Sequence, residues 1–551
     1  MKYRKLWLTL PVLLAVLWLG FRDDDLFFQL KKNFTLFGRI YEELATGYVD
    51  PVDPARLMRK GVDEMMRSLD PYTVFFDEAD NQDAELQMRS GIGTTGIGLG
   101  VRDGGKITVV ELLEGYSGAE QGVRVGDVIT HLNEKTVMGM NVRELMGLLN
   151  GEPGTTASVR IHREGEAEPL SFTLVRKKFE LKNVTHAGFV ADDSTRGIGY
   201  IKLAQFGQGC AREVREAVED LKATNKLKML VLDLRGNPGG LLDQAVMIVS
   251  LFVPEKSMIV STKGRLATSE IQMSSSMPPV LPDTPLAVLI DRNSASASEV
   301  VSGAIQDMDR GVIIGETSFG KGLVQSVKPL LYNTSMKFTS AKYYTPSGRC
   351  IQALNYDKRT EDGEPLPVPD SLRKPFKTKN GRIVKDGRGI DPDIALRMGV
   401  TTELERALMQ QGSFMLFANV YAAQNASIPA NFTVDDKILG EFKSWLASRN
   451  FNYATKSERA LTRLQAELEK AGYAKSAQRT GDVLTQIARD KAEDFARNAP
   501  RLKLLLRAQI LARYYGPAAQ IKAQILNDPF MTEAEKVLGD TKRYNRILGK
   551  S

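Results

Sequence analysis

Alternating apolar runs and amphipathic segments in the middle of the chain constrain its fold most strongly. Between residues 179 and 395, short runs such as "MLVLDLR" and "PLAVLI" are separated by stretches with helical spacing such as "AREVREAVEDLKA". Strands that alternate with helices in this way indicate an α/β domain whose strands are largely parallel. The sequence therefore predicts such a domain over residues 179–398.

Three further regions have other patterns. Residues 23–91 have helical spacing broken at "DPVDP", and residues 92–178 carry short β-like runs between glycine-rich turns, with one helix at "NVRELMGLLN". Residues 399–551 follow a helical pattern with charged polar faces. A chain of 551 residues agrees with three to four domains at ~100–200 residues each. The predicted fold class is multidomain α+β: an α/β core with an N-terminal helical segment, a β-rich module and an α-helical C-terminal region.

The N-terminus has the layout of an export signal. Lys2, Arg4 and Lys5 precede an uncharged stretch, residues 6–21, and no A-x-A-like cleavage site follows it. We expect residues 1–22 to be an uncleaved membrane anchor, with a cleaved signal as the alternative, although sixteen helical residues span only about 24 Å of a ~30 Å hydrocarbon core. Because basic residues stay in the cytoplasm, the rest is expected on the periplasmic side of the inner membrane, in the cell envelope.

Composition and motif context argue against several other classes. The net charge of +7 includes no run of five like charges, so no nucleic-acid partner is expected. Cys210 and Cys350 lack the spacing of a metal site or a disulfide framework. "GIGTTG" (residues 91–96) is followed by strand-like sequence rather than a helix, and "GETSFGKG" (residues 315–322) lacks the Ser or Thr that binds Mg²⁺. We expect neither a metal nor an organic cofactor.

Four serines follow the apolar run "PLAVLI". They are Ser294, Ser296, Ser298 and Ser302, within "DRNSASASEVVSGAIQ". A strand, a tight turn and a helix N-terminus would present a reactive hydroxyl beside free N–H groups and the helix dipole. Ser296 and Glu299 also have the S-x-x-E spacing of a capping box. Ser296 is therefore either a nucleophile or an ordinary N-cap with its hydroxyl bonded to the backbone.

Lys321 offers a base for such a serine. It lies between Gly320 and Gly322 in mostly apolar surroundings, whereas the three histidines lie upstream of both segments. A lysine works as a base only if its pKa falls from ~10.4 toward ~7–8, which burial can achieve. Taken alone, a lysine such as Lys321 is in most cases a solvated surface residue.

The serine segment followed by "GETSFGKGLVQ" resembles the C-terminal processing peptidases, also called tail-specific proteases. The resemblance implies that Ser296, the middle serine of S-A-S-A-S-E, is the nucleophile and that Lys321 of F-G-K-G is the base. It implies that Gln325 orients the lysine. It also implies that the N–H groups of Ala297 and of Gly240, in "GNPGG", form the oxyanion hole.

Residues 92–178 resemble a PDZ domain, in the position where the same family carries one. "GIGLGV" matches the carboxylate-binding loop, in which successive N–H groups hold the C-terminal carboxylate of a peptide that adds as a strand. Peptide binding is therefore expected at Gly96, Ile97, Gly98 and Leu99. A glycine-rich turn without a ligand is the alternative.

The resemblance covers roughly residues 30–395 and implies a membrane-anchored serine endopeptidase. Its PDZ domain would capture accessible C-termini of protein substrates, and the Ser–Lys pair would cleave them. Many family members have arginine where this chain has Asn150, so a regulatory contact by that arginine is not expected here. The alternative function is a catalytically inert PDZ scaffold that binds protein C-termini. Homo-oligomerisation and the role of residues 399–551 are left open.

Overall fold

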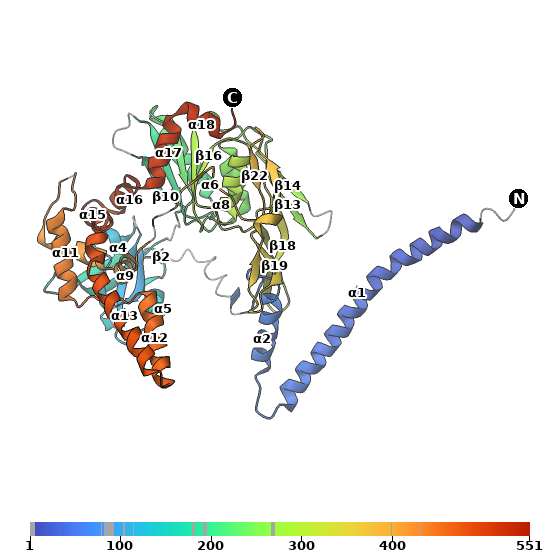
Figure 1. Cartoon of the computed structure of the whole chain (residues 1–551), viewed down its shortest axis with the longest axis horizontal. Helices are drawn as coiled ribbons and strands as arrows, with labels where there is room; N and C mark the ends of the chain where they lie inside the picture. Colours follow the sequence, from blue (N-terminus) through green and yellow to red (C-terminus); the bar gives the residue numbers. More distant parts are fainter. Residues whose placement is uncertain are drawn as a thin grey trace. The chain divides into compact units, whose positions relative to one another are not determined.

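The computed structural model describes residues 6–550 except 79, 82–92, 103–104, 114, 179–181, 191–195, 266–269, 398, 400 and 430; for residues 6–25 and 517 it describes the backbone alone. The chain forms two units. The N-terminal unit comprises residues 1–82 with 325–340, and the main unit comprises residues 83–324 with 341–551. Figure 1 shows the chain coloured by position in the sequence, from blue at the N-terminus to red at the C-terminus.

The N-terminal unit contains the helices expected there. Its elements are α1 (Leu6–Gly47), α2 (Pro54–Arg67), β1 (Val74–Phe76) and parts of β17 (Leu323–Pro329) and β18 (Ser335–Tyr344). Asp53 caps α2, which begins at a proline, so the predicted breaker does separate two helices. No helix within the described part of the chain is both long and apolar enough to cross a membrane. The anchor therefore stays a prediction.

A six-stranded sheet forms the centre of the main unit, in the order β10-β11-β12-β15-β16-β23. Its strands are β10 (Val184–Phe189), β11 (Ile198–Leu203), β12 (Met229–Asp233), β15 (Leu286–Ile290), β16 (Val312–Gly315) and β23 (Ile394–Ala395). All neighbours pair in parallel except β10, which is an antiparallel edge strand. The predicted α/β core is confirmed.

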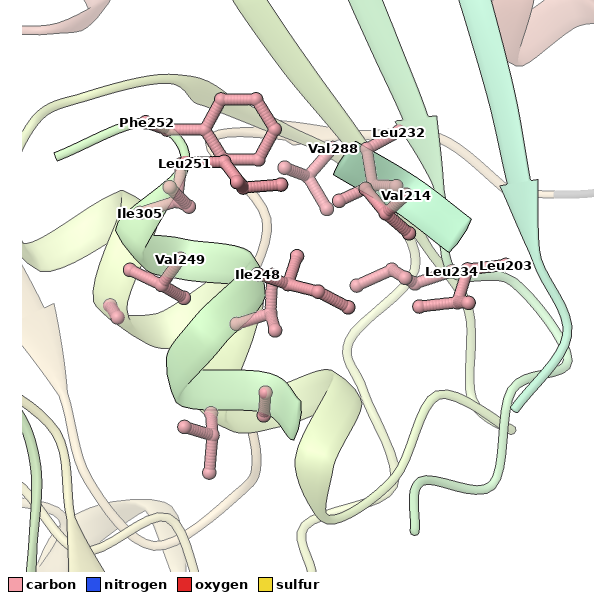
Figure 2. Packing of buried hydrophobic residues seen from close by; sticks show 14 of the residues in the cluster. Leu203, Val214, Leu232, Leu234, Ile248, Val249, Leu251, Phe252, Val288 and Ile305 are labelled. Atoms are coloured by element: carbon pink, nitrogen blue, oxygen red, sulfur yellow. The ribbon is translucent and has the colours of Figure 1, made fainter. Parts of the chain in front are cut away.

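One face of this sheet packs against three helices. They are α6 (Cys210–Ala223), α7 (Leu242–Ser250) and α8 (Ala297–Asp307). Leu232 and Val288 point from the sheet into an apolar cluster with Val214 of α6 and Ile248 of α7 (Figure 2). Apolar burial of this kind contributes about 25 cal/mol per Å² removed from water, so this cluster is a main source of the core's stability.

The opposite face is covered by the end of the chain, α17 (Pro529–Gly539) and α18 (Thr541–Ile547), drawn in red in Figure 1. Val231, Leu289 and Ile314 alternate with the residues of the first face and pack against these helices, for example against Phe530. Each central strand is thus buried on both faces. The predicted C-terminal region is consequently divided between two cores, because its last two helices belong to the α/β domain.

Most of the remaining C-terminal helices contribute to a separate core around Phe442, Leu506 and Ile510. They are α9 (Glu403–Gln410), α10 (Ser413–Gln424), α11 (Asp436–Ser448), α14 (Asp494–Arg497), α15 (Ala499–Tyr515) and α16 (Pro517–Ile525). The helices α12 (Lys456–Lys470) and α13 (Ala474–Ala492) pack against each other. The predicted α-helical region is confirmed.

The β-rich module forms an antiparallel sheet, with the expected helix and a second, short helix that was not expected. Its strands follow the order β3 (Ile97–Arg102), β4 (Lys106–Leu112), β5 (Val128–Leu132), β7 (Thr156–His162) and β8 (Leu170–Val175), with β6 (Lys135–Thr136) beside β5. The helices are α4 (Ser117–Glu120) and α5 (Val142–Leu149), and Asn141 starts α5 with a capping box to Glu144. Strand β3 is an edge strand, and α5 packs beside it.

Smaller elements complete the main unit. They are β2 (Gly93–Thr94), β9 (Lys177–Lys178), β13 (Met258–Gly264), β14 (Ile271–Ser274), β19 (Leu354–Arg359), β20 (Pro365–Pro367), β21 (Pro375–Lys377), β22 (Ile383–Lys385) and the 3₁₀ turn η2 (Asp370–Leu372). The end of β18 pairs with β13, which places Tyr343 of β18 opposite Thr262.

Candidate active site

The structure distinguishes the four serines by their burial and their hydrogen bonds. Ser294, Ser298 and Ser302 are each 0% exposed. Their hydroxyls donate to main-chain carbonyl oxygens 2.8, 2.9 and 2.8 Å away. Ser296 is the partly exposed serine of the four, and it immediately precedes α8. Of this group, Ser296 is therefore the serine that a substrate could reach.

The backbone of Ser296 has an unusual conformation. Its φ is 55° and its ψ is −113°, outside the extended region usual for an N-cap. A positive φ at a non-glycine residue is uncommon and costs about 1–3 kcal/mol, and it is found mainly at functional sites. The Glu299 N–H donates to the main-chain oxygen of Ser296 at 2.8 Å, so the Ser296 hydroxyl is not needed to cap that amide.

The buried carboxylate of Glu299 joins the serine segment to the lysine segment. Its Oε2 accepts hydrogen bonds from the main-chain N–H groups of Ser296 at 2.8 Å and Lys321 at 2.9 Å. Its Oε1 accepts from the Ser318 hydroxyl at 2.5 Å and from the Gly320 N–H at 2.7 Å. Burial raises the pKa of Glu299, although all four hydrogen bonds act in the opposite direction.

Tyr343 makes a second bridge between the same two positions. Its hydroxyl donates to the main-chain oxygen of Ser296 at 3.2 Å and to that of Lys321. The two residues are thus tied together through their N–H groups by Glu299 and through their carbonyls by Tyr343. The structure therefore brings Ser296 and Lys321 together, with Lys321 itself half-buried.

The glycine turn after β12 lies directly against the serine. A Cβ atom at Gly239 would lie 2.8 Å from the Cβ of Ser296 and 2.9 Å from the main-chain nitrogen of Ala297, and Gly239 has a φ of 98°. Contacts under 3.0 Å leave no room for a side chain, so this approach requires glycine. Ala297 is the first residue of α8, which places its N–H at the positive end of the helix dipole.

Hydrogen bonds fix the glycine turn to the serine segment. The Asn237 carbonyl accepts from the Ala295 N–H at 3.1 Å and from the Ser298 hydroxyl at 2.9 Å. Gly240 forms a bridge to Phe206 on its other side. The two segments predicted to supply the oxyanion donors are therefore neighbours.

Comparison with known proteins assigns this arrangement to a family. Residues 197–358 match Peptidase family S41, and residues 404–538 match "Probable PDZ-protease, C-terminal helical domain". A carboxy-terminal-processing protease from Bartonella bacilliformis is 36% identical over 339 residues, which cover 61% of this chain and 76% of that protein. The chain belongs to peptidase family S41.

Two further relatives of this S41 peptidase agree. The carboxy-terminal processing protease CtpA of Bacillus subtilis is 27% identical over 368 residues, covering 66% of this chain and 76% of the relative. A probable CtpA-like serine protease of Staphylococcus aureus is 29% identical over 395 residues, covering 69% and 76%. The protein is thus a serine protease of the carboxy-terminal-processing type, which confirms the family and the enzyme class expected from the sequence.

Gln325 lies in β17, in the part of that strand that belongs to the N-terminal unit. Its side-chain Nε2 donates to the Thr339 hydroxyl of β18 at 3.4 Å. Its orienting role toward the lysine stays a prediction.

The predicted carboxylate-binding loop is mostly strand. Only Gly96 lies in the turn, whereas Ile97, Gly98 and Leu99 already belong to β3 and pair with β4 from the Ile97–Leu112 register onward. This agrees with the strand-like sequence expected after Gly96. Ile97, Gly98 and Leu99 lie on the edge strand beside α5, and peptide binding at these residues stays a prediction.

Sequence reasoning missed two residues of the S41 site. Glu299 was considered only as part of a capping box, and Tyr343 was given no role at the site. The S-x-x-E spacing signalled the contact of Glu299 with Ser296, but nothing local signalled its contact with Lys321. Tyr343 has no local signal either, because its contacts arise only when β18 reaches the site.

Proposed function

We propose that this S41 peptidase cleaves peptide bonds with Ser296 as nucleophile and Lys321 as general base. The bridging of both residues by the single Oε2 atom of Glu299 is the observation that supports it most directly. In this mechanism neutral Lys321 accepts the Ser296 hydroxyl proton as Oγ attacks the peptide carbonyl. The amine leaves with a proton from Lys321, and water hydrolyses the acyl-enzyme to regenerate Ser296.

The oxyanion would be held by the N–H groups of Ala297 and Gly240. The close approach of Gly239 to the Ala297 nitrogen supports this, because a carbonyl oxygen near Ser296 would face both segments. Preorganised donors of this kind typically contribute 10²–10³-fold, or ~2.7–4 kcal/mol each. The role of Gln325 in orienting Lys321 rests on the family resemblance.

The β-rich module is proposed to be a PDZ domain that selects substrates. An edge strand with a helix beside it is the geometry into which an extended peptide adds as a further strand. Strand β3 and α5 have this arrangement. Protein substrates with accessible, flexible C-termini would bind there before cleavage at Ser296.

A location in the cell envelope follows from the N-terminal sequence. Residues 6–21 are proposed to hold the enzyme at the inner membrane, with both structural units on the periplasmic side. The basic flank and the uncharged stretch support this.

An inert PDZ scaffold is the alternative function. A protein that only binds C-termini has no use for a strained φ at Ser296, which costs about 1–3 kcal/mol. It equally has no use for a glycine pressed against that residue. Both observations favour the protease.

Digestion of casein by the purified full chain tests the proposal. The parent protein should degrade casein, and Ser296→Ala should abolish degradation. Ser302→Ala is the matched control, because it removes a hydroxyl from the same helix that bonds only within that helix, and it should retain most activity. Degradation by Ser296→Ala at the parent rate would exclude Ser296 as the nucleophile. A well-folded parent that leaves casein and short peptides intact would favour the scaffold.

A further inference from the structure

A charged cluster lies at the end of β12, directly before the glycine turn. Asp233 is 1% exposed and accepts hydrogen bonds from the Tyr200 hydroxyl at 2.7 Å and from Lys202 Nζ at 3.1 Å. It also accepts from the Arg235 side chain, with Nη2 at 2.6 Å. Burial alone would raise the pKa of Asp233, but Arg235 and Lys202 outweigh it and lower that pKa, so the carboxylate is ionised.

Arg235 has a second carboxylate partner, which comes from the C-terminal region. Its Nη2 lies 2.6 Å from Asp528 Oδ2, and its guanidinium lies over the ring of Phe530 at 4.9 Å from the centroid. Asp528 also caps α17 by accepting from the Phe530 N–H at 2.8 Å. One side chain therefore both starts α17 and binds the arginine.

The charges in this cluster balance only when Asp528 is counted. Lys202 and Arg235 are the cations, and Asp233 and Asp528 are the anions. The Arg235 side chain is only 14% exposed, so removal of Asp528 would leave an excess positive charge with little access to water. Removing one partner of a buried ion pair is strongly destabilising because it leaves the other charge buried and unpaired, even where the intact pair adds little to the free energy of unfolding.

Arg235 is bonded directly to the first glycine of the turn. Its main-chain N–H donates to Asp233 at 2.9 Å, and its carbonyl accepts from Lys202. The next residue, Gly236, donates to Asp291 at 2.9 Å. Both the side chain and the backbone of Arg235 are thus held in place. The turn that contains Gly239 and Gly240 begins at the next residue.

We propose that Asp528 is a positioning residue for the peptidase reaction. By holding Arg235, it sets the position of residues 236–240 and hence of the Gly240 N–H that stabilises the oxyanion. This inference rests on the proposed function. The C-terminal helical region thereby takes part in building the active site as well as covering the sheet. Because misplacement of a reacting group by about 1 Å can cost 10²-fold in rate, a shift of this turn should reduce turnover rather than substrate binding.

The test uses Asp528→Asn in the full chain, with hydrolysis of a short fluorogenic peptide. Asparagine caps helices as well as aspartate does, so α17 keeps its start while the charge is lost. We expect kcat to fall about 10- to 100-fold with KM within about twofold of the parent. Asp528→Glu, which restores the charge, should recover part of this loss. Circular dichroism at the assay temperature checks that every variant is folded.

Glu535→Gln is the matched control. Glu535 lies on the same helix and also pairs with an arginine of the core, Arg196 at 3.1 Å, but that arginine does not lead into the glycine turn. This variant should keep kcat within about twofold. Equal loss in both variants would mean that α17 acts only through packing and would overturn the proposal.

A double variant tests the route through Arg235. If Asp528 acts by holding Arg235, Arg235→Gln together with Asp528→Asn should have the kcat of Arg235→Gln alone. The inference would be contradicted if the double variant lost kcat by the product of the two single losses, or if Asp528→Asn changed KM alone.

The failure of this inference can be distinguished from the failure of the proposed function. If hydrolysis by the parent does not depend on Ser296, the function fails; if it does and folded Asp528→Asn keeps its kcat, only the positioning role fails.

Discussion

The Glu299 carboxylate lies 2.9 Å from the main-chain nitrogen of Lys321. This contact makes the backbone of the lysine segment part of the same unit as the serine that starts α8. A carboxylate is suited to this position because it is an acceptor at both oxygens and faces four donors. The lysine segment is therefore held through its backbone.

Glu299→Gln should disturb the site more than a change of one atom suggests. The amide keeps one acceptor oxygen and turns an NH₂ group toward two of the four donors, so up to two hydrogen bonds are lost. Unsatisfied buried donors cost about 1–3 kcal/mol, so we expect a loss of that size in the free energy of unfolding by urea and a large loss of casein digestion. Glu219→Gln, on an exposed pair with Arg215, should change neither.

The same residue predicts a pH dependence of stability. Burial raises the pKa of Glu299, so the folded protein binds a proton at a higher pH than the unfolded chain does. The stabilising contribution is therefore fully present below the unfolded pKa, ~4.5, and is lost as the pH rises through the folded value. Urea unfolding at several pH values should show the parent gaining stability relative to Glu299→Gln on acidification. A pH-independent difference would contradict the raised pKa.

Lys321→Arg tests the base. Arginine keeps the positive charge and much of the length, but its pKa exceeds ~12 and it cannot accept the serine proton. General-base catalysis typically supplies 10²–10⁴-fold, so hydrolysis should fall by at least about 10²-fold while the protein remains folded. Lys328→Arg, at an exposed position of β17, is the control and should behave as the parent. Hydrolysis within tenfold of the parent by Lys321→Arg would remove lysine from the mechanism.

Gly239→Ala should inactivate the enzyme more than Gly236→Ala does. Both residues have a positive φ, 98° and 71°, so both substitutions carry backbone strain of about 1 kcal/mol or more. Only at Gly239 would the added Cβ meet Ser296 at 2.8 Å; at Gly236 nothing lies within 4 Å. Thermal unfolding of the two variants measures the effect of backbone strain on stability. Peptide hydrolysis by the same variants shows the additional effect of displacing Ser296. Equal losses of activity would mean that the close approach has no effect on catalysis.

Much of the site could be predicted from the sequence because its motifs are short, continuous segments of the chain. The strand, turn and helix around Ser296 follow from a run of apolar residues and a helical pattern, and the family resemblance paired that serine with Lys321. The double contact of Glu299 could not be predicted, since it depends on two loops meeting in three dimensions. The strand-like run after Gly96 was expected, but its pairing with β4 from Ile97 onward could not be predicted because it depends on a second segment of the chain.

The role of the last two helices illustrates a different limit. Amphipathic spacing shows that a helix buries one face, but it does not show which surface covers that face. The sequence therefore predicted α17 and α18 as helices without showing that they close the second face of the sheet. The charge pair between Arg235 and Asp528 is equally invisible, because nearly three hundred residues separate its members in sequence.

This assignment of the final helices to the α/β core predicts a specific loss of stability. Leu538 of α17 is buried against the sheet, whereas Leu526, just before that helix, is exposed. Truncating a buried leucine to alanine costs about 2–5 kcal/mol through lost transfer energy and a residual cavity, and an exposed one costs far less. Leu538→Ala should therefore lower the free energy of unfolding of the α/β core in urea by that amount, and Leu526→Ala should leave it within about 0.5 kcal/mol. If α17 were instead a loosely attached tail, Leu538→Ala would match Leu526→Ala, and the glycine turn would have no fixed support from the C-terminal region.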